Sequence, residues 1–168
     1  MRALENTNRP KLKTLIVGDG TGRSRLEQAA GKRLGSSVLL TGRVPRDQVP
    51  DYLAAMDVAS LPQSVDQVGS FRYTTKLSEY LAAGLPVVTG QIPLAYDLDS
   101  GWLWRLPGHA PWDVRYIQAL ANLMDGLTCA ELNVKQLAVP RSLPEFDRES
   151  QVRRVTAWIN ELLNEMRI

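Results

Sequence analysis

Short runs of β-branched and aliphatic residues alternate along this chain with segments of helical periodicity, and this alternation limits the possible folds more than any other feature. The predicted strands lie at 14–18, 37–41, 57–61, 86–89 and, more briefly, 102–106. The predicted helices lie at 23–34, 47–56, 74–83, 112–127, 130–137 and 147–166. Because strands separated by helices are typical of parallel sheets, we predict an α/β protein: a three-layer α/β/α Rossmann-like domain with a mainly parallel sheet and a long C-terminal helix.

The last of these helices carries an apolar stripe. Val152, Val155, Ile159, Leu162 and Met166 follow one another at alternating steps of three and four residues, which places them on one face. We expect this face to pack on its own domain. The alternative is that part of it packs on a partner domain absent from the chain.

Length and charge exclude several classes of protein. A chain of 168 residues has the size of one domain, so we treat 1–168 as a single domain. Its 20 Lys and Arg against 18 Asp and Glu give a net charge of +2, without the basic excess that nucleic-acid binding needs, and no nucleic-acid partner is expected. Neither a transmembrane segment nor a signal peptide is visible, and a cytoplasmic location is expected.

The cysteine, histidine and tryptophan residues further limit the reactions and ligands that are possible. Cys129 and His109 are the only cysteine and the only histidine, so an intramolecular disulfide and a metal site built from several Cys or His are excluded. Trp102, Trp104 and Trp112 lie close in sequence and could stack on a sugar or a base, but we favour buried packing for them.

A glycine-rich turn, VGDGTG, joins the first predicted strand to the first predicted helix. Glycine lets the backbone turn sharply and approach a ligand, and the N-terminus of a helix attracts phosphate. The glycines stand at 18, 20 and 22, which differs from the dinucleotide-binding spacing G-x-G-x-x-G. From the residues alone, a tight turn with Asp19 or Thr21 capping the helix is favoured over a ligand site.

A second group of polar residues begins a later helix. Thr74, Thr75, Lys76 and Glu79 stand at the start of a helical segment that ends at Gly84, just before a predicted strand. Hydroxyls, first-turn N–H groups and an ammonium suit a pyrophosphate, and a carboxylate one turn further on can accept hydrogen bonds from ribose hydroxyls. The residues alone support equally a capped helix with an exposed Lys76–Glu79 ion pair.

Several longer motifs occur in a characteristic order: VGDG (17–20), RLE (25–27), VLLTGRVP (38–45), VPDYLAAMDVASLP (49–62) and YTTKLSEYLAAGLPVVTG (73–90). In this order they resemble the C-terminal, donor-binding half of retaining glycosyltransferases with the GT-B fold, in the family-4 and group-1 class. The most specific part is KLSEYLAAGLPVV at 76–88, and the resemblance is strong over 15–89.

The resemblance implies which residues contact a nucleotide-diphospho-sugar donor. Glu79 is expected at the ribose, and the residues expected at the pyrophosphate are Thr74, Thr75 and Lys76. Those expected against the nucleobase are Gly42, Arg43 and Val44, and those expected to line the cleft between two domains are Gly18, Asp19 and Gly20. It implies no metal and no further cofactor.

This sequence departs from the family pattern in two ways. Members often carry an acidic residue eight positions before the ribose-binding Glu, where this chain has Phe71. Members also usually carry an earlier strand, followed by an Arg and a Lys that neutralise the departing diphosphate, and an N-terminal half that binds the acceptor. We therefore expect a domain that is incomplete at its N-terminal edge and lacks one strand of the usual set.

The resulting functional prediction is a hexosyltransferase that works with retention, present here as its donor domain and inactive alone. No residue of the chain is assigned a catalytic role. The expected partners are the nucleotide-sugar and the missing acceptor-binding domain, through which any peripheral membrane association would come. Two alternatives stay open: a non-catalytic sugar-nucleotide-binding or interaction module, and a sugar-nucleotide epimerase of the same fold.

Overall fold

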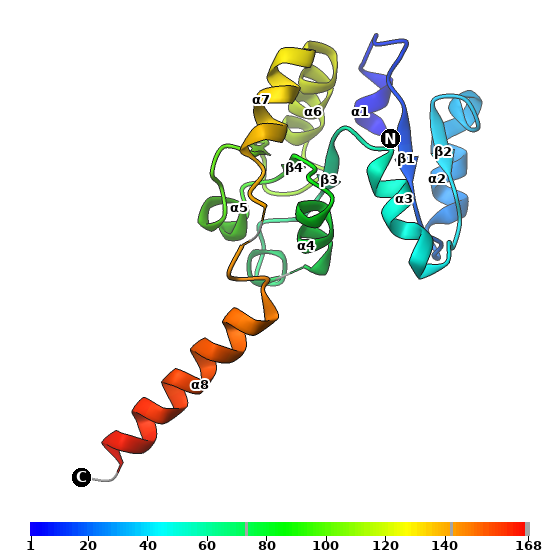
Figure 1. Ribbon diagram of the computed structural model, residues 1–168. Coiled ribbons are helices and arrows are strands. Elements are labelled where there is room, and N and C mark those ends of the chain that lie inside the picture. Colours follow the sequence, from blue (N-terminus) through cyan, green and yellow to red (C-terminus); the bar gives the residue numbers. More distant parts are fainter. Residues whose placement is uncertain (73, 142, 167–168) are drawn as a thin grey trace.

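A computed structural model describes residues 1–72, 74–141 and 143–166 and shows a Rossmann-like α/β fold in which helices alternate with parallel strands (Figure 1). The strands are β1 (Thr14–Ile16), β2 (Val38–Leu40), β3 (Ala59–Leu61), β4 (Val87–Thr89) and β5 (Leu103–Arg105). The α-helices are α1 (Arg2–Glu5), α2 (Arg23–Ala30), α3 (Val49–Ala54), α4 (Thr75–Ala82), α5 (Pro93–Asp97), α6 (Val114–Gly126), α7 (Cys129–Ala138) and α8 (Arg148–Glu165). Short 3-10 turns lie at Gly31–Arg33, Arg46–Gln48 and Gly69–Phe71.

All strand pairs of the described residues are parallel, but they form two hydrogen-bonded pieces. β1 pairs with β2, with Leu15 opposite Leu39. In the second piece β4 lies between β3 and β5, with Val88 opposite both Ser60 and Trp104. The prediction of a mainly parallel sheet with α-helical connections is confirmed, and the interruption of the sheet between β1 and β3 is a feature that the sequence pattern did not show.

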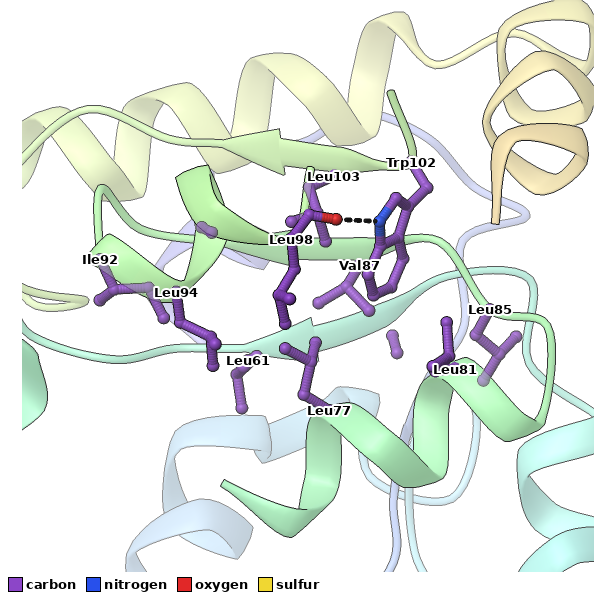
Figure 2. Close-up of a cluster of buried hydrophobic side chains, with 12 residues drawn as sticks. Leu61, Leu77, Leu81, Leu85, Val87, Ile92, Leu94, Leu98, Trp102 and Leu103 are labelled. Carbon is purple, nitrogen blue, oxygen red and sulfur yellow. Dashed lines mark hydrogen bonds between the residues drawn. The ribbon is translucent and has the colours of Figure 1, made fainter. Parts of the chain in front are cut away.

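The main hydrophobic core lies between the β3–β4–β5 sheet and the helices α4 and α5. Figure 2 shows Leu77 and Leu81 of α4 pointing towards Val87 on the strand above them. Trp102 is 0% exposed, and its indole N–H donates a hydrogen bond of 2.9 Å to the carbonyl of Leu98 (Figure 2). Burying an indole requires a partner for its N–H, and the end of α5 supplies one.

Polar side chains fix where the principal helices begin. The N-cap residues of α4, α6, α7 and α8 accept hydrogen bonds from backbone N–H groups of the first turn, and they are Thr74, Asp113, Thr128 and Asp147. Ser, Thr and Asp at this position satisfy donors that the helix cannot pair internally. The predicted helix starts at 74, 112, 130 and 147 therefore lie within two residues of the observed ones.

The last helix is the exception to the predicted packing. Its described stripe residues are all exposed, from Leu162 at 39% to Met166 at 81%, and α8 has no buried residue. In Figure 1 it projects away from the rest of the molecule. The expectation that this face packs on its own domain is wrong, because no element of the described chain lies against it.

The N-terminal segment is bonded to the C-terminal end of α6. The backbone N–H of Asn8 and the hydroxyl of Thr7 both donate to the Asp125 carboxylate, and the Arg9 guanidinium donates to the carbonyls of Met124 and Leu127. The bonds from Arg9 satisfy carbonyls that the helix end leaves unpaired.

Among the described residues, no helix is both long and apolar enough to cross a membrane.

Replacing Trp102 with Phe should lower the free energy of unfolding by about 2 kcal/mol, because it leaves the Leu98 carbonyl without its donor and opens a void in the core. Urea unfolding followed by circular dichroism measures the change. Trp112→Phe is the matched control, because Trp112 is 69% exposed and its replacement should leave stability nearly unchanged. Equal effects of the two substitutions would contradict this account of the core.

Candidate functional site

The loops that follow β1 and β2 meet at two glycines. The N–H of Gly18 donates a hydrogen bond of 3.0 Å to the carbonyl of Gly42. Both residues have positive φ angles, 132° and 74°, a region that favours glycine. A Cβ on Gly42 would also lie 2.9 Å from Nη1 of Arg23. The structure thus brings together the two loops that the sequence analysis assigned to the cleft and to the nucleobase.

The residues of these two loops differ in exposure. Asp19 and Gly20 are exposed, and the Asp19 carboxylate accepts the adjacent N–H of Gly20 at 3.0 Å. In the second loop Gly42 is buried, Arg43 is exposed and Val44 is half-buried. Arg43 is therefore accessible to a ligand beside a backbone junction that the two glycines hold in place.

The N-terminus of α2 carries no side-chain cap. Its N-cap residue is Gly22, so the expectation that Asp19 or Thr21 caps this helix is wrong. The first turn of an uncapped helix presents N–H groups and the positive end of the helix dipole to its surroundings. The Arg23 N–H donates to the carbonyl of Gly20 at 3.0 Å, and among the described residues no carboxylate or hydroxyl of the glycine turn caps the others.

The polar group on α4 lies at the beginning of that helix, as predicted. The Thr74 hydroxyl accepts the N–H of Lys76 at 3.3 Å, while Thr75, Lys76 and Glu79 are exposed. The alternative of a capped helix with an exposed Lys76–Glu79 ion pair is therefore confirmed for the cap. It is wrong for the ion pair, since none of the ion pairs among the described residues joins Lys76 to Glu79.

The two groups of predicted residues lie at carboxyl ends of parallel strands but on different pieces of the sheet. The glycine loops follow β1 and β2, and α4 follows β3. In open α/β sheets, ligands bind outside the carboxyl ends of the strands. Within the described parts of the chain, no hydrogen bond connects the glycine loops with α4, so the structure brings together residues within each group and leaves the groups separate.

The loop between β3 and α4 is organised by Asp66, which sequence analysis missed. Its carboxylate accepts the Ser64 hydroxyl at 2.5 Å and the N–H groups of Val68 and Gly69 at 2.9 and 2.6 Å. These hydrogen bonds, the one from Gly69 foremost, hold the pKa of Asp66 below its ordinary value. The signal was present as Ser-x-Asp-x-x-Gly, in which an Asp accepts from the backbone two and three residues onward.

Further contacts of this loop are equally specific. A Cβ on Gly69 would lie 2.0 Å from the carbonyl oxygen of Ser64, so no larger residue fits there. The N–H of Val65 donates to the carbonyl of His109 at 2.6 Å and joins this loop to the one after β5. Phe71, the last residue of the 3-10 turn, has 85% of its surface exposed. The part of this loop from Ser64 to Phe71 is therefore a hydrogen-bonded turn that presents an aromatic side chain to solvent.

Two buried polar atoms lie near the carboxyl end of β4. The Tyr116 hydroxyl and Oε1 of Gln63 have no hydrogen-bond partner among the described residues. Burial raises the pKa of Tyr116 to about 12, so the phenol stays neutral at physiological pH. A Cβ on Gly90 would meet both the Gln63 carbonyl and the Tyr116 ring. This region is closely packed, and neither Tyr116 nor Gln63 supplies an ionised group for acid–base catalysis.

The tryptophans and the histidine have different surroundings. Trp104 is half-buried, and its indole N–H donates a hydrogen bond to the Glu131 carboxylate. The Lys135 ammonium lies over the Trp104 ring, 5.2 Å from the ring centroid. Trp112 is exposed, so the prediction of buried packing is wrong for that residue. His109 is exposed in the loop after β5. Among the described residues, no cluster of three or more His, Cys, Asp or Glu could hold a metal ion.

Comparison with known proteins gives one family and one fold. Residues 1–108 match the family described as glycosyl transferases group 1. No curated protein matches the chain. The structure is similar to the crystal structure of the pneumococcal O-GlcNAc transferase GtfA in complex with UDP and GlcNAc, with a TM-score of 0.59 and 17% sequence identity. That alignment covers 96% of this chain but only 32% of the other, so the chain spans about a third of the protein it matches.

Replacing Asp66 with Asn should lower the thermal unfolding midpoint at neutral pH and have little effect in acid. The pKa of Asp66 is lower in the folded chain than in the unfolded chain, where it is about 3.9. The ionised carboxylate therefore stabilises the fold at pH values above about 3.9, and this stabilisation is lost as the pH falls through the folded-state pKa. Scanning calorimetry of both proteins between pH 7 and pH 2 measures the difference. Asp57→Asn, at an exposed carboxylate before β3, is the control; a difference at Asp66 that does not vary with pH would contradict the prediction.

Proposed function

The chain belongs to the group 1 glycosyl transferases, and from this premise we propose that it is the donor-binding part of such an enzyme, with a nucleotide-diphospho-sugar as its ligand. The observation that carries the proposal is the arrangement on α4. Lys76 and Glu79 are both exposed there, near a helix N-terminus, and no ion pair between described residues includes either of them.

Each part of this arrangement suits one part of the donor. The Lys76 ammonium and the first-turn N–H groups attract a diphosphate, and their attraction increases as negative charge develops on the departing group. The Glu79 carboxylate accepts hydrogen bonds from ribose hydroxyls and fixes the orientation of the donor. The glycine loops would receive the nucleobase beside Arg43. The matched GtfA structure contains UDP and GlcNAc, which supports a ligand of this class.

In the proposed reaction a hexosyl group passes to an acceptor with retention at the anomeric carbon. The described residues supply the donor side alone, and the acceptor is held by a part of the enzyme outside this chain. We therefore propose that the isolated chain binds the nucleotide but does not transfer the sugar. Measurable transfer by the purified chain, with any sugar-nucleotide and acceptor, would be inconsistent with this proposal.

One observation favours a second function. Phe71 stands where many members carry an acid and is 85% exposed, without a polar group to contact the transferred sugar. A sugar-nucleotide-binding module without catalytic activity would tolerate this residue. Replacing Phe71 with Glu in the complete protein distinguishes an active transferase from a non-catalytic module. Nucleotide affinity should stay unchanged in either case. Sugar transfer that is absent from the natural protein and present in the variant would indicate a module that has lost its activity.

The direct test is calorimetric titration of the purified chain with UDP, GDP and ADP. We expect saturable binding of one of them, weakened about tenfold to a hundredfold by Glu79→Ala, since a hydrogen bond to a charged group contributes about 1.5–3 kcal/mol. Lys76→Ala should weaken the diphosphate but not the corresponding nucleoside, because only the diphosphate carries the charge that the ammonium attracts.

Glu161→Ala is the matched control, since Glu161 is an exposed carboxylate on α8, remote from the strand ends. It should leave nucleotide affinity unchanged. Binding that is equally weakened by Glu161→Ala and by Glu79→Ala would contradict the assignment of Glu79 to the ribose, and the absence of binding to all three nucleotides would contradict the donor-binding function.

A further inference from the structure

The helix α8 exposes a broad apolar face. At about 100° per residue, seven large apolar side chains fall within an arc of about 140°, and together we call them the α8 apolar face: Val152, Val155, Trp158, Ile159, Leu162, Leu163 and Met166. Their exposed fractions run from 39% for Leu162 to 81% for Met166. In Figure 1, α8 projects away from the rest of the molecule. A helix face of this width is normally buried, and no part of the described chain covers it.

The start of α8 is fixed to the domain. Phe146, just before the helix, packs against the main core, and the Gln151 amide donates a hydrogen bond of 2.8 Å to the Pro144 carbonyl. From residue 152 to residue 166 every side chain is exposed. The helix has 18 residues, or about 27 Å at about 1.5 Å each, so its first turn is held while the remainder is open to a second helix along its length.

The charged residues divide α8 into a basic and an acidic part. Three arginines and one glutamate lie in residues 148–154, and two glutamates are the only charged residues in 155–165. The net charge of the helix is therefore zero, which gives an anionic membrane surface no electrostatic attraction to it. The separation of charge along the helix instead suits a partner with the reverse order of charges.

The charged side chains of α8 differ in their contacts. Arg153 forms ion pairs with Asp147 and Glu149, at 3.9 and 3.7 Å. In contrast, no ion pair among the described residues includes Arg154 or Glu161. These two side chains are exposed and are therefore accessible to opposite charges on a partner.

Arg154, Glu161 and Glu165 lie along one edge of the α8 apolar face. Arg154 and Glu161 are seven residues apart, which is close to two turns, and Glu165 follows one turn later. Trp158 lies on the same edge between them. When two such helices pack antiparallel, this edge of each copy faces the same edge of the other. A two-fold axis near Trp158 then brings Arg154 of each copy opposite Glu161 of the second.

Parallel packing lacks this complementarity. It would align the basic parts of the two helices with each other, and likewise the acidic parts, and juxtaposed like charges disfavour association. The charge pattern of α8 therefore favours a second copy of the helix in the antiparallel orientation.

The area of the face is sufficient for a weak dimer. Seven side chains that are about half exposed bury roughly 500 Å² per copy when another helix covers most of them, or about 1,000 Å² for the pair. Specific protein interfaces begin at about this size, and those at the lower limit bind weakly. We therefore expect a dissociation constant of about 10–100 µM.

We propose that the α8 apolar face is a self-association surface, on which a second copy of this chain packs its own α8 antiparallel to the first. The interface is two-fold symmetric. Trp158 of the two copies lies beside the axis, the aliphatic side chains form a core on both sides of it, and Arg154 of each copy pairs with Glu161 of the second. Because α8 projects away from the strand ends (Figure 1), association should leave nucleotide affinity unchanged.

Sedimentation velocity of the purified chain between about 1 and about 300 µM tests the proposal, and the chain should pass from monomer to dimer over this range. Ile159→Lys should raise the dissociation constant at least about tenfold, because it places a charge at the centre of the face. Ala157→Lys is the matched control, since it adds the same side chain on the opposite side of α8 and should leave association unchanged. Because α8 has no buried residue, neither variant should lower the thermal unfolding midpoint of the domain.

Charge reversal tests the orientation. At low salt, Arg154→Glu and Glu161→Arg should each raise the dissociation constant about fivefold to tenfold, because each places like charges opposite each other twice in the dimer. Both substitutions in one chain exchange the charges and should restore the constant to within about twofold of the natural value. Residues 154 and 161 are two turns apart and do not meet on one helix, so the restoration comes from contacts between copies.

A chain that stays monomeric up to about 300 µM would overturn the proposal and leave the face to another polypeptide or to a membrane. Equal effects of Ile159→Lys and Ala157→Lys would also overturn it, because the association would then lie elsewhere on the molecule. A chain with both charge reversals that associates no more strongly than the single variants would overturn the antiparallel pairing.

Discussion

The pairing of β4 with a strand on each side is the interaction on which the rest of this structure depends. All three residues of β4 are buried, and the Thr89 hydroxyl donates to the Leu61 carbonyl at 2.9 Å, while the Leu106 N–H donates to the carbonyl of Thr89 at 2.8 Å. A central parallel strand satisfies its backbone on both sides and packs side chains on both faces. Its pairing fixes where β3 and β5 end, and so where the Asp66 loop and the start of α4 emerge.

The two candidate helix N-termini present different groups to a ligand. In α4 the Thr74 oxygen accepts the Lys76 N–H, but a hydroxyl that accepts one bond still has its own hydrogen to donate. In α2 the N-cap is glycine, the Arg23 N–H donates to the Gly20 carbonyl, and no side chain of the described residues caps the remaining first-turn N–H groups. An anion at α2 would therefore meet backbone donors, whereas one at α4 would meet a hydroxyl and the Lys76 ammonium, a difference that suits the two ends of an asymmetric ligand.

The parts of this fold that sequence predicts are those encoded by local periodicity and by single caps. The five strands and the helices begun by Thr74, Asp113, Thr128 and Asp147 follow from such signals. The helix α5 has five residues, too few to show a period. The positions of the candidate site residues were predictable in the same way, since the glycines and the α4 residues stand at strand ends. The Asp66 loop was missed because it has no periodicity and is held by bonds from one side chain to backbone N–H groups two and three residues later. The exposure of α8 and Trp112 was not predictable, because a pattern reports that a face is apolar and not which surface covers it.

The interruption of the sheet also accounts for the separation of the candidate site into two groups. The glycine loops leave the carboxyl ends of β1 and β2, and α4 follows the carboxyl end of β3. In open α/β sheets, ligands bind outside the carboxyl ends of the strands, so each group lies where such a sheet binds a ligand. A ligand that contacts both groups must therefore extend across the interruption. The proposed donor, with a nucleobase at one end and a sugar diphosphate at the other, is a ligand of that elongated kind.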